Sequence, residues 1–121
     1  MGNVFEDQTK IMVACDQTVC EWNQSQFDMY YTLIQEEVSE LKEAINNTDR
    51  VEILDALIDI IVVTAGAINS TGSNAQGAWD EVMKTNFAKV DPITGKVKKR
   101  EDGKVLKPEG WKEPNLKSFV I

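Results

Sequence analysis

The chain has 121 residues, of which 42% are hydrophobic and 27% are charged, so it is long enough to fold as one domain around its own core. This mix excludes an intrinsically disordered chain. The chain contains two cysteines, Cys15 and Cys20, and no histidine, which excludes His-containing zinc sites and serine–histidine catalysis. We interpret both cysteines as reduced thiols of a cytoplasmic protein.

Acidic and basic residues are distributed unevenly around a net charge of −7. Residues 1–83 contain 3 basic and 15 acidic side chains, whereas residues 84–121 contain 10 basic and 5 acidic side chains. An acidic surface repels nucleic acid, so we expect no nucleic-acid partner. The split offers carboxylates to a cation and lysines to an anion; alternatively, the basic segment only neutralises the acidic one.

The N-terminal segment and the longest apolar run both argue against membrane association. Residues 1–10 carry polar and acidic side chains where a secretory signal has an apolar region. The longest apolar run, residues 60–68, is too short to cross a bilayer. We therefore expect no membrane partner and a cytoplasmic location.

Periodic apolar positions predict four helices. The first is expected over residues 5–18, and the second begins at a cap formed by Asn23 or Ser25. The apolar side chains of the second helix follow at intervals of three and four: Phe27, Tyr30, Tyr31, Ile34, Val38, Leu41 and Ile45.

The third helix is expected over residues 50–69, directly after the sequence NNTD, in which Thr48 or Asp49 can act as the cap. Glu52 is placed to complete a capping box with Asp49. The short connection makes this helix antiparallel to the second. Its core stripe is expected to consist of Leu54, Leu57, Ile58, Ile61, Val62, Ala65 and Ile68. Because its second half is apolar nearly all round, it is either central or packed against a second subunit.

The fourth helix is expected to begin near Asn74, and helical periodicity stops after Val90. Turn-forming residues follow in DPITGK and REDGKV, the second of which predicts one small hairpin, and KPEGWKEPN excludes a helix. We predict an all-α protein with a four-helix-bundle-like core over about residues 1–90 and an extended basic tail, residues 91–121. Core and tail are expected to form a single domain spanning residues 1–121.

Acidic side chains are expected on facing flanks of the second and third helices. At roughly 100° per residue, Glu37 falls at the edge of the apolar stripe and Glu40 further along the same side, whereas Glu36 points the opposite way. One flank of the third helix carries Glu52, Asp55 and Asp59. The two flanks together would form a pocket of carboxylate oxygens.

Asp59 is the strongest indication of that pocket, because it interrupts the apolar run LIDIIVV. A buried charge without a partner is costly, so something positive is expected beside it. Carboxylates without His or Cys suit a hard cation such as Mg²⁺ or Mn²⁺, which shares its shell with water and substrate phosphates. The alternative is that these acids form an ordinary solvated helix face.

Two parts of the sequence resemble a known family. Glu37-x-x-Glu40 followed by Glu52-x-x-Asp55 resembles the signature of the all-α nucleoside triphosphate pyrophosphohydrolases, which include MazG, dimeric dUTPases and phosphoribosyl-ATP pyrophosphohydrolase. EVMKTNFAKVD followed by REDGKVLKPEGWKEPNL is similar to the tail of short MazG-like proteins of bacteriophages and some bacteria. The resemblance covers residues from about 30 to 116.

The resemblance implies an enzyme that cleaves the α–β bond of a nucleotide to a monophosphate and pyrophosphate, with two or three Mg²⁺ or Mn²⁺ ions. It assigns the metal ligands to Glu37, Glu40, Glu52 and Asp55. It makes Glu37 and Glu36 the catalytic candidates, with Glu36 activating the attacking water. It assigns phosphate binding to Asn86 and Lys89, with Lys98, Arg100, Lys104 and Lys107 as candidates in the tail.

A base-recognition pocket is expected near Trp22, Asn23 and Gln26, since an indole stacks on a base and an amide can pair with its edge. Alternatively, Trp22 is a core residue. The resemblance favours a purine deoxynucleotide such as dGTP over phosphoribosyl-ATP, and it implies a homodimer or homotetramer. The remaining alternative is a non-catalytic helical interaction protein, in which the acids are surface and the third helix is the interface.

Overall fold

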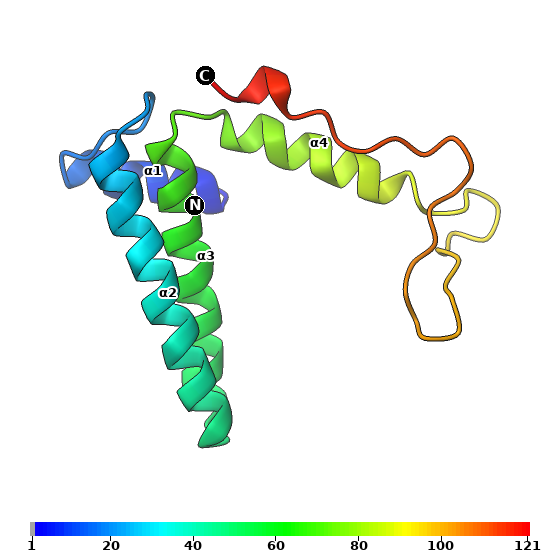
Figure 1. The fold of residues 1–121 in the computed structure, drawn as a ribbon, viewed down its shortest axis with the longest axis horizontal. Coiled ribbons are helices and arrows are strands. Elements are labelled where there is room, and N and C mark those ends of the chain that lie inside the picture. The colour runs from blue at the N-terminus through cyan, green and yellow to red at the C-terminus, as the bar shows by residue number, and fades with distance from the viewer. Residues whose placement is uncertain (1) are drawn as a thin grey trace. The chain divides into compact units, whose positions relative to one another are not determined.

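The computed structural model describes residues 2–121, which form two compact units. The first unit contains residues 2–75 together with Val120–Ile121, and the second contains Gln76–Phe119. The first unit is built from three helices, α1 (Val4–Ala14), α2 (Gln24–Asn46) and α3 (Arg50–Ser70) (Figure 1). Helix α4 (Ala75–Phe87) leads into the second unit, which ends in a short 3-10 helix, Lys117–Phe119. No strand forms within residues 2–121, and the all-α prediction is confirmed.

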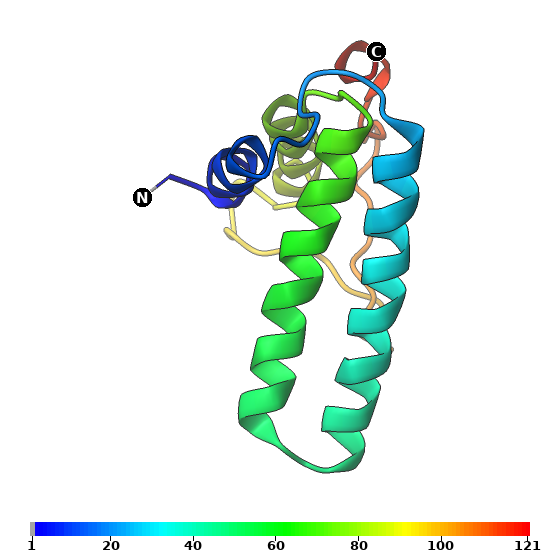
Figure 2. The ribbon, with the colours of Figure 1, turned by 90° about the vertical axis from the view of Figure 1, so that its left-hand side faces the viewer.

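Helices α2 and α3 lie side by side and run antiparallel (Figure 2). The side chain of Asn23 caps α2 by accepting a hydrogen bond from the Gln26 N–H at 3.1 Å. Asp49 caps α3 in the same way, accepting from the Glu52 N–H at 3.2 Å. Of the two candidates predicted for each cap, Asn23 and Asp49 are the ones that form it, and the short turn between the helices produces the predicted antiparallel pair.

Helix α1 ends at Ala14 rather than at residue 18 as predicted. Asp16 has a φ of 58°, in the left-handed region, which a right-handed helix cannot continue through. The Gln17 N–H bonds the Met12 carbonyl oxygen at 2.9 Å, which closes the end of the helix. The chain then turns towards the start of α2.

The hydrophobic core of the first unit lies where α1 meets α2 and α3. Met12, Tyr30 and Ala67 are buried there. Partly buried apolar residues pack around them: Val19, Phe27, Leu33, Ile34 and Val63. The Tyr30 hydroxyl donates to Gln17 Oε1 at 2.5 Å, so its polar end is satisfied within the core.

Gly66 is the point of closest approach between α3 and α2. A methyl group at this position would overlap the ring of Tyr30. We expect Gly66→Ala to lower the free energy of unfolding by about 1–3 kcal/mol, because overpacking outweighs the better helix propensity of alanine. Urea denaturation of the variant checks this, with Thr64→Ala on the exposed side of α3 as the control. Equal stability of Gly66→Ala and the parent protein would contradict the packing described here.

The predicted core stripe of α3 is correct only at its C-terminal end, where Ala65 is buried. Five of its seven members are exposed in the single chain: Leu54, Leu57, Ile58, Ile61 and Val62. Leu54, for example, is 61% exposed. The reason is that α2 covers one side of α3, while the contacts of α1 do not extend over its N-terminal turns. Helix α3 packs against both α1 and α2, but much of its apolar stripe stays uncovered within the chain.

The second unit consists of α4 and the tail. The Trp111 indole N–H donates to the Thr85 carbonyl oxygen at 2.7 Å, and the Asn115 N–H donates to Glu81 Oε2 at 2.9 Å. These bonds hold the tail along α4. The predicted small hairpin is present as one antiparallel bridge, between Lys99 and Val105.

None of the helices within residues 2–121 combines the length and the hydropathy needed to cross a bilayer.

Candidate functional site

Glu37 is the acid whose environment departs most from that of a surface carboxylate. It is half-buried on α2, and its Oε2 atom is buried without a hydrogen-bond partner. Burial raises the pKa of Glu37 to about 7, and the neighbouring Glu40 acts in the same direction through a hydrogen bond and its negative charge. The charges of Asp59 and Asp55 raise the pKa further. The structure thus places two acids of α2 beside two acids of α3.

The four neighbouring carboxylates differ from the four that the sequence motif assigns as metal ligands. Glu37, Glu40 and Asp55 belong to both sets. Glu52 is exposed near the start of α3, and it is not among the charges that act on Glu37. Asp59 is the second acid of α3 whose charge acts on Glu37. It lies one turn beyond Asp55 on the same flank, and its place in an apolar run was the signal that identified it.

The carboxylate oxygens described above are ligands of the kind that a hard divalent cation requires. A buried carboxylate oxygen without a partner, with further carboxylates in its neighbourhood, is stabilised by a cation. Within residues 2–121, no three acidic or cysteine side chains converge as a ready-made ligand cage. Mg²⁺ commonly takes one or two carboxylates together with waters and phosphates. The residues present therefore fit a metal ion shared with a phosphorylated ligand.

The raised pKa of Glu37 predicts the pH dependence of the metal-free protein. The native state retains a proton on Glu37 that the unfolded chain loses between about pH 4.5 and 7. The contribution of Glu37 to the free energy of unfolding therefore increases as the pH falls from 7 towards 4.5. When the pH is lowered from 7.5 to 5.5, we expect the free energy of unfolding to change in favour of the parent protein relative to Glu37→Gln. Urea denaturation with EDTA present measures this difference. Identical pH profiles would contradict this environment for Glu37.

Glu36 is exposed on α2, one residue before Glu37. Consecutive helical residues point roughly 100° apart, so the two side chains leave the helix in different directions. Glu36 is also absent from the charges that act on Glu37. Its role in activating water stays a prediction.

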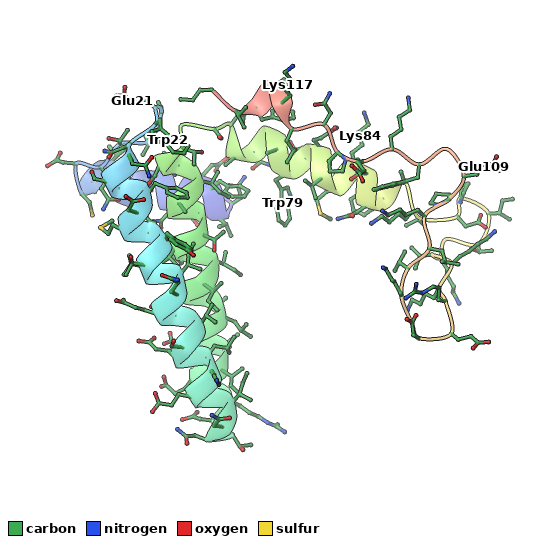
Figure 3. The ribbon with its side chains drawn as sticks, in the orientation of Figure 1. Glu21, Trp22, Trp79, Lys84, Glu109 and Lys117 are labelled. Carbon is green, nitrogen blue, oxygen red and sulfur yellow. The ribbon has the colours of Figure 1, made fainter. Side chains whose placement is uncertain are left out.

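The residues expected to recognise a base lie where the chain enters α2. Trp22 stacks on Phe27 with ring centroids 5.7 Å apart, and it is 53% exposed, so the core alternative is wrong (Figure 3). Asn23 caps α2 and donates from Nδ2 to Thr18 Oγ1 at 2.9 Å. Gln26 donates from Nε2 to the Thr18 carbonyl oxygen at 2.7 Å. Both amides therefore hold the loop before α2, and only the indole is free to stack on a ligand.

The basic candidates fall into two groups within the second unit. Lys89, Lys98 and Lys107 line an open cavity of about 250 Å³, and Lys89 Nζ donates to Asn86 Oδ1 at 3.2 Å. The hairpin turn holds the other two, Arg100 and Lys104, which do not line this cavity.

Arg100 is engaged within that turn, with its guanidinium 2.6 Å from the Asp102 carboxylate. This contact lowers the pKa of Asp102. Lys104 is exposed. The structure thus brings together four of the six predicted phosphate-binding residues: Asn86, Lys89, Lys98 and Lys107.

A comparison with known protein families bears on this site. The family model described as phosphoribosyl-ATP pyrophosphohydrolase matches residues 12–86, which is more than half of the chain. The matched segment contains the whole of α2 and α3, and so all the carboxylates described above. No curated protein matches the chain. The match covers both helices that carry the carboxylates, α2 and α3. The chain therefore belongs to the phosphoribosyl-ATP pyrophosphohydrolase family, within the MazG-like all-α nucleoside triphosphate pyrophosphatase superfamily.

Proposed function

We propose that this protein hydrolyses the α–β phosphoanhydride of a nucleotide triphosphate, releasing a nucleoside monophosphate and pyrophosphate. Membership of the family supports a nucleotide pyrophosphohydrolase activity, and enzymes of this family generally use divalent metal ions. The observation that carries the proposal is the buried, unpartnered Oε2 of Glu37 among the carboxylates of Glu40, Asp55 and Asp59.

The cofactor that we propose is Mg²⁺ or Mn²⁺, with two or three ions per site. Bound ions of this kind lower the pKa of a water and neutralise charge on phosphate oxygens. Glu37, Glu40 and Asp55 would hold them, with Glu52 and Asp59 as the outer members of the α3 flank. Glu36 would accept a proton from the attacking water. Phosphate binding is proposed for Asn86 and Lys89, with Lys98, Arg100, Lys104 and Lys107 as further candidates.

Two substrates are proposed for this chemistry. A purine deoxynucleotide such as dGTP is favoured by the similarity of EVMKTNFAKVD and REDGKVLKPEGWKEPNL to the tails of short MazG-like proteins. Phosphoribosyl-ATP is favoured by the name of the matching family. The exposed face of Trp22 offers a stacking surface for the base of either one.

We also propose that the protein self-associates as a homodimer or homotetramer and acts on free nucleotides in the cytoplasm. The exposed apolar side chains of α3 support the self-association, because a soluble chain seldom leaves such a stripe in water. A groove of about 380 Å³ between α1 and α3, lined by Val4, Ile11, Ile58 and Ile61, continues this surface. Neither nucleic acid nor membrane is proposed as a partner.

A substrate panel tests the proposed function. The protein is incubated with each dNTP, each NTP and phosphoribosyl-ATP, with Mn²⁺ or Mg²⁺, and nucleotide consumption is followed by chromatography. We expect one purine nucleotide to be consumed fastest, and no consumption with EDTA. Consumption of phosphoribosyl-ATP alone would make it the substrate. No consumption of any compound would favour the non-catalytic interaction protein.

A further inference from the structure

Trp111 brings together cationic side chains that are distant in the sequence of the second unit. Its indole N–H donates to the Thr85 carbonyl oxygen of α4 at 2.7 Å, which fixes the position of the ring. The ammonium nitrogens of Lys89 and Lys107 lie 5.0 and 4.8 Å from the ring centroid. Both distances are typical of cation–π contacts. One indole therefore contacts both a lysine that follows α4 and a lysine of the tail.

The same two lysines, with Lys98, line the cavity of about 250 Å³. The hairpin brings Lys98 to this place, since its carbonyl oxygen accepts from the Leu106 N–H at 2.7 Å, one residue before Lys107. Within the part of the chain that the structure describes, the ion pair that forms is Arg100–Asp102, and the three lysines of the cavity are not paired.

Two carboxylates, Asp91 and Glu109, also line the cavity. Asp91 Oδ1 already accepts a hydrogen bond from the Ile93 N–H at 2.8 Å. Three lysines thus face two acids, one of which is engaged. Three ammonium groups around one cavity attract an anion, and an anion with several oxygens can contact more than one of them. The cavity fits the chemistry of a di- or triphosphate.

We propose that Trp111 is a positioning residue that holds Lys89 and Lys107 as a paired binding site for the terminal phosphates of the nucleotide. The identity of this ligand rests on the proposed pyrophosphohydrolase function. The indole does not touch the reacting bond; it contacts two cations that belong to separate segments of the chain.

Titration calorimetry with inorganic pyrophosphate, in EDTA and without metal, tests this directly. We expect Trp111→Leu to weaken binding about tenfold, because both cation–π contacts are lost. Trp111→Phe keeps an aromatic face and loses the bond to Thr85, so it is expected to restore part of the affinity. Lys107→Ala leaves Trp111 and its hydrogen bond in place, and it is expected to weaken binding to a similar degree. Circular dichroism confirms that each variant retains its helices.

The matched control is Lys117→Ala. Lys117 lies on the 3-10 helix and does not line the cavity; Figure 3 shows it away from Glu109, which does. Pyrophosphate binding is therefore expected to stay unchanged in Lys117→Ala. In steady-state kinetics with dGTP, Trp111→Leu is expected to raise KM about tenfold while kcat stays within about twofold, since the contact is made equally in the ground and transition states.

The outcomes separate this inference from the proposed function. Equal pyrophosphate affinity in Trp111→Leu and the parent protein, or no pyrophosphate binding by the parent protein, would overturn the role of Trp111. If the parent protein hydrolyses no nucleotide but binds pyrophosphate in a manner that depends on Trp111 and Lys107, the proposed function fails and the anion site stands.

Discussion

Replacing Glu37 with glutamine is expected to lower kcat for nucleotide hydrolysis by about 100- to 1,000-fold. The substitution keeps the shape of the side chain but removes the negative charge that Glu37 contributes beside Glu40, Asp55 and Asp59. The buried Oε2 atom then no longer offers a charge to a divalent cation. The loss of several kcal/mol of transition-state stabilisation corresponds to that reduction in rate.

Glu43→Gln is the matched control for this experiment. Glu43 lies on the same helix, is exposed, and is not among the charges that act on Glu37. It should retain the full rate of the parent protein. A Glu37→Gln protein with a rate within about threefold of the parent would show that the cluster is not the catalytic centre.

Adding Mn²⁺ is expected to raise the thermal unfolding midpoint by on the order of 10 °C when the ion is a hundredfold above its Kd. Binding to the native state alone contributes about 2.7 kcal/mol under those conditions. Asp55→Asn should remove most of this shift, because Asp55 is the carboxylate of α3 that belongs both to the motif and to the cluster around Glu37. Differential scanning calorimetry with and without Mn²⁺ measures it.

The same variant distinguishes the two classes of function. In a non-catalytic interaction protein, Mn²⁺ has no effect on the midpoint, and Asp55→Asn raises stability by relieving repulsion between like charges. In a metal-dependent enzyme, the parent protein and Glu43→Gln respond to Mn²⁺ alike and Asp55→Asn does not. A shift of equal size in Asp55→Asn would contradict the proposed ligand set.

Local chemistry explains which parts of the fold could be predicted from the sequence. The caps at Asn23 and Asp49 and the antiparallel α2–α3 pair depend on residues close together in the chain, and all were predicted. The exposure of Leu54 and Ile58 was not predicted, because periodicity identifies the apolar face of a helix but not the segment that covers it. The early end of α1 depends on the left-handed backbone of Asp16, which no periodic pattern reveals.

The candidate site shows the same division. Helical spacing correctly placed Glu37, Glu40 and Asp55 on facing flanks, because that geometry follows from the two helices alone. The amides of Asn23 and Gln26 were expected to face a ligand, but they bond the adjacent loop. Their partners could be identified only from tertiary structure.

Trp111 is a further residue that the sequence left without a role. Its contacts join α4 to the tail, and these segments are separated by a hairpin whose path the sequence does not specify. The sequence signal that could have identified Trp111 is the presence of a large aromatic residue in a stretch rich in Pro, Gly and Lys.

The most direct test of the central claim is identification of the products by ³¹P NMR, using the preferred nucleotide, Mn²⁺ and the full chain. The α–β hydrolase proposed here predicts a nucleoside monophosphate and an equal amount of pyrophosphate, with neither formed by Glu37→Gln. A nucleoside diphosphate with orthophosphate would contradict it, because the bond broken would then be the β–γ bond.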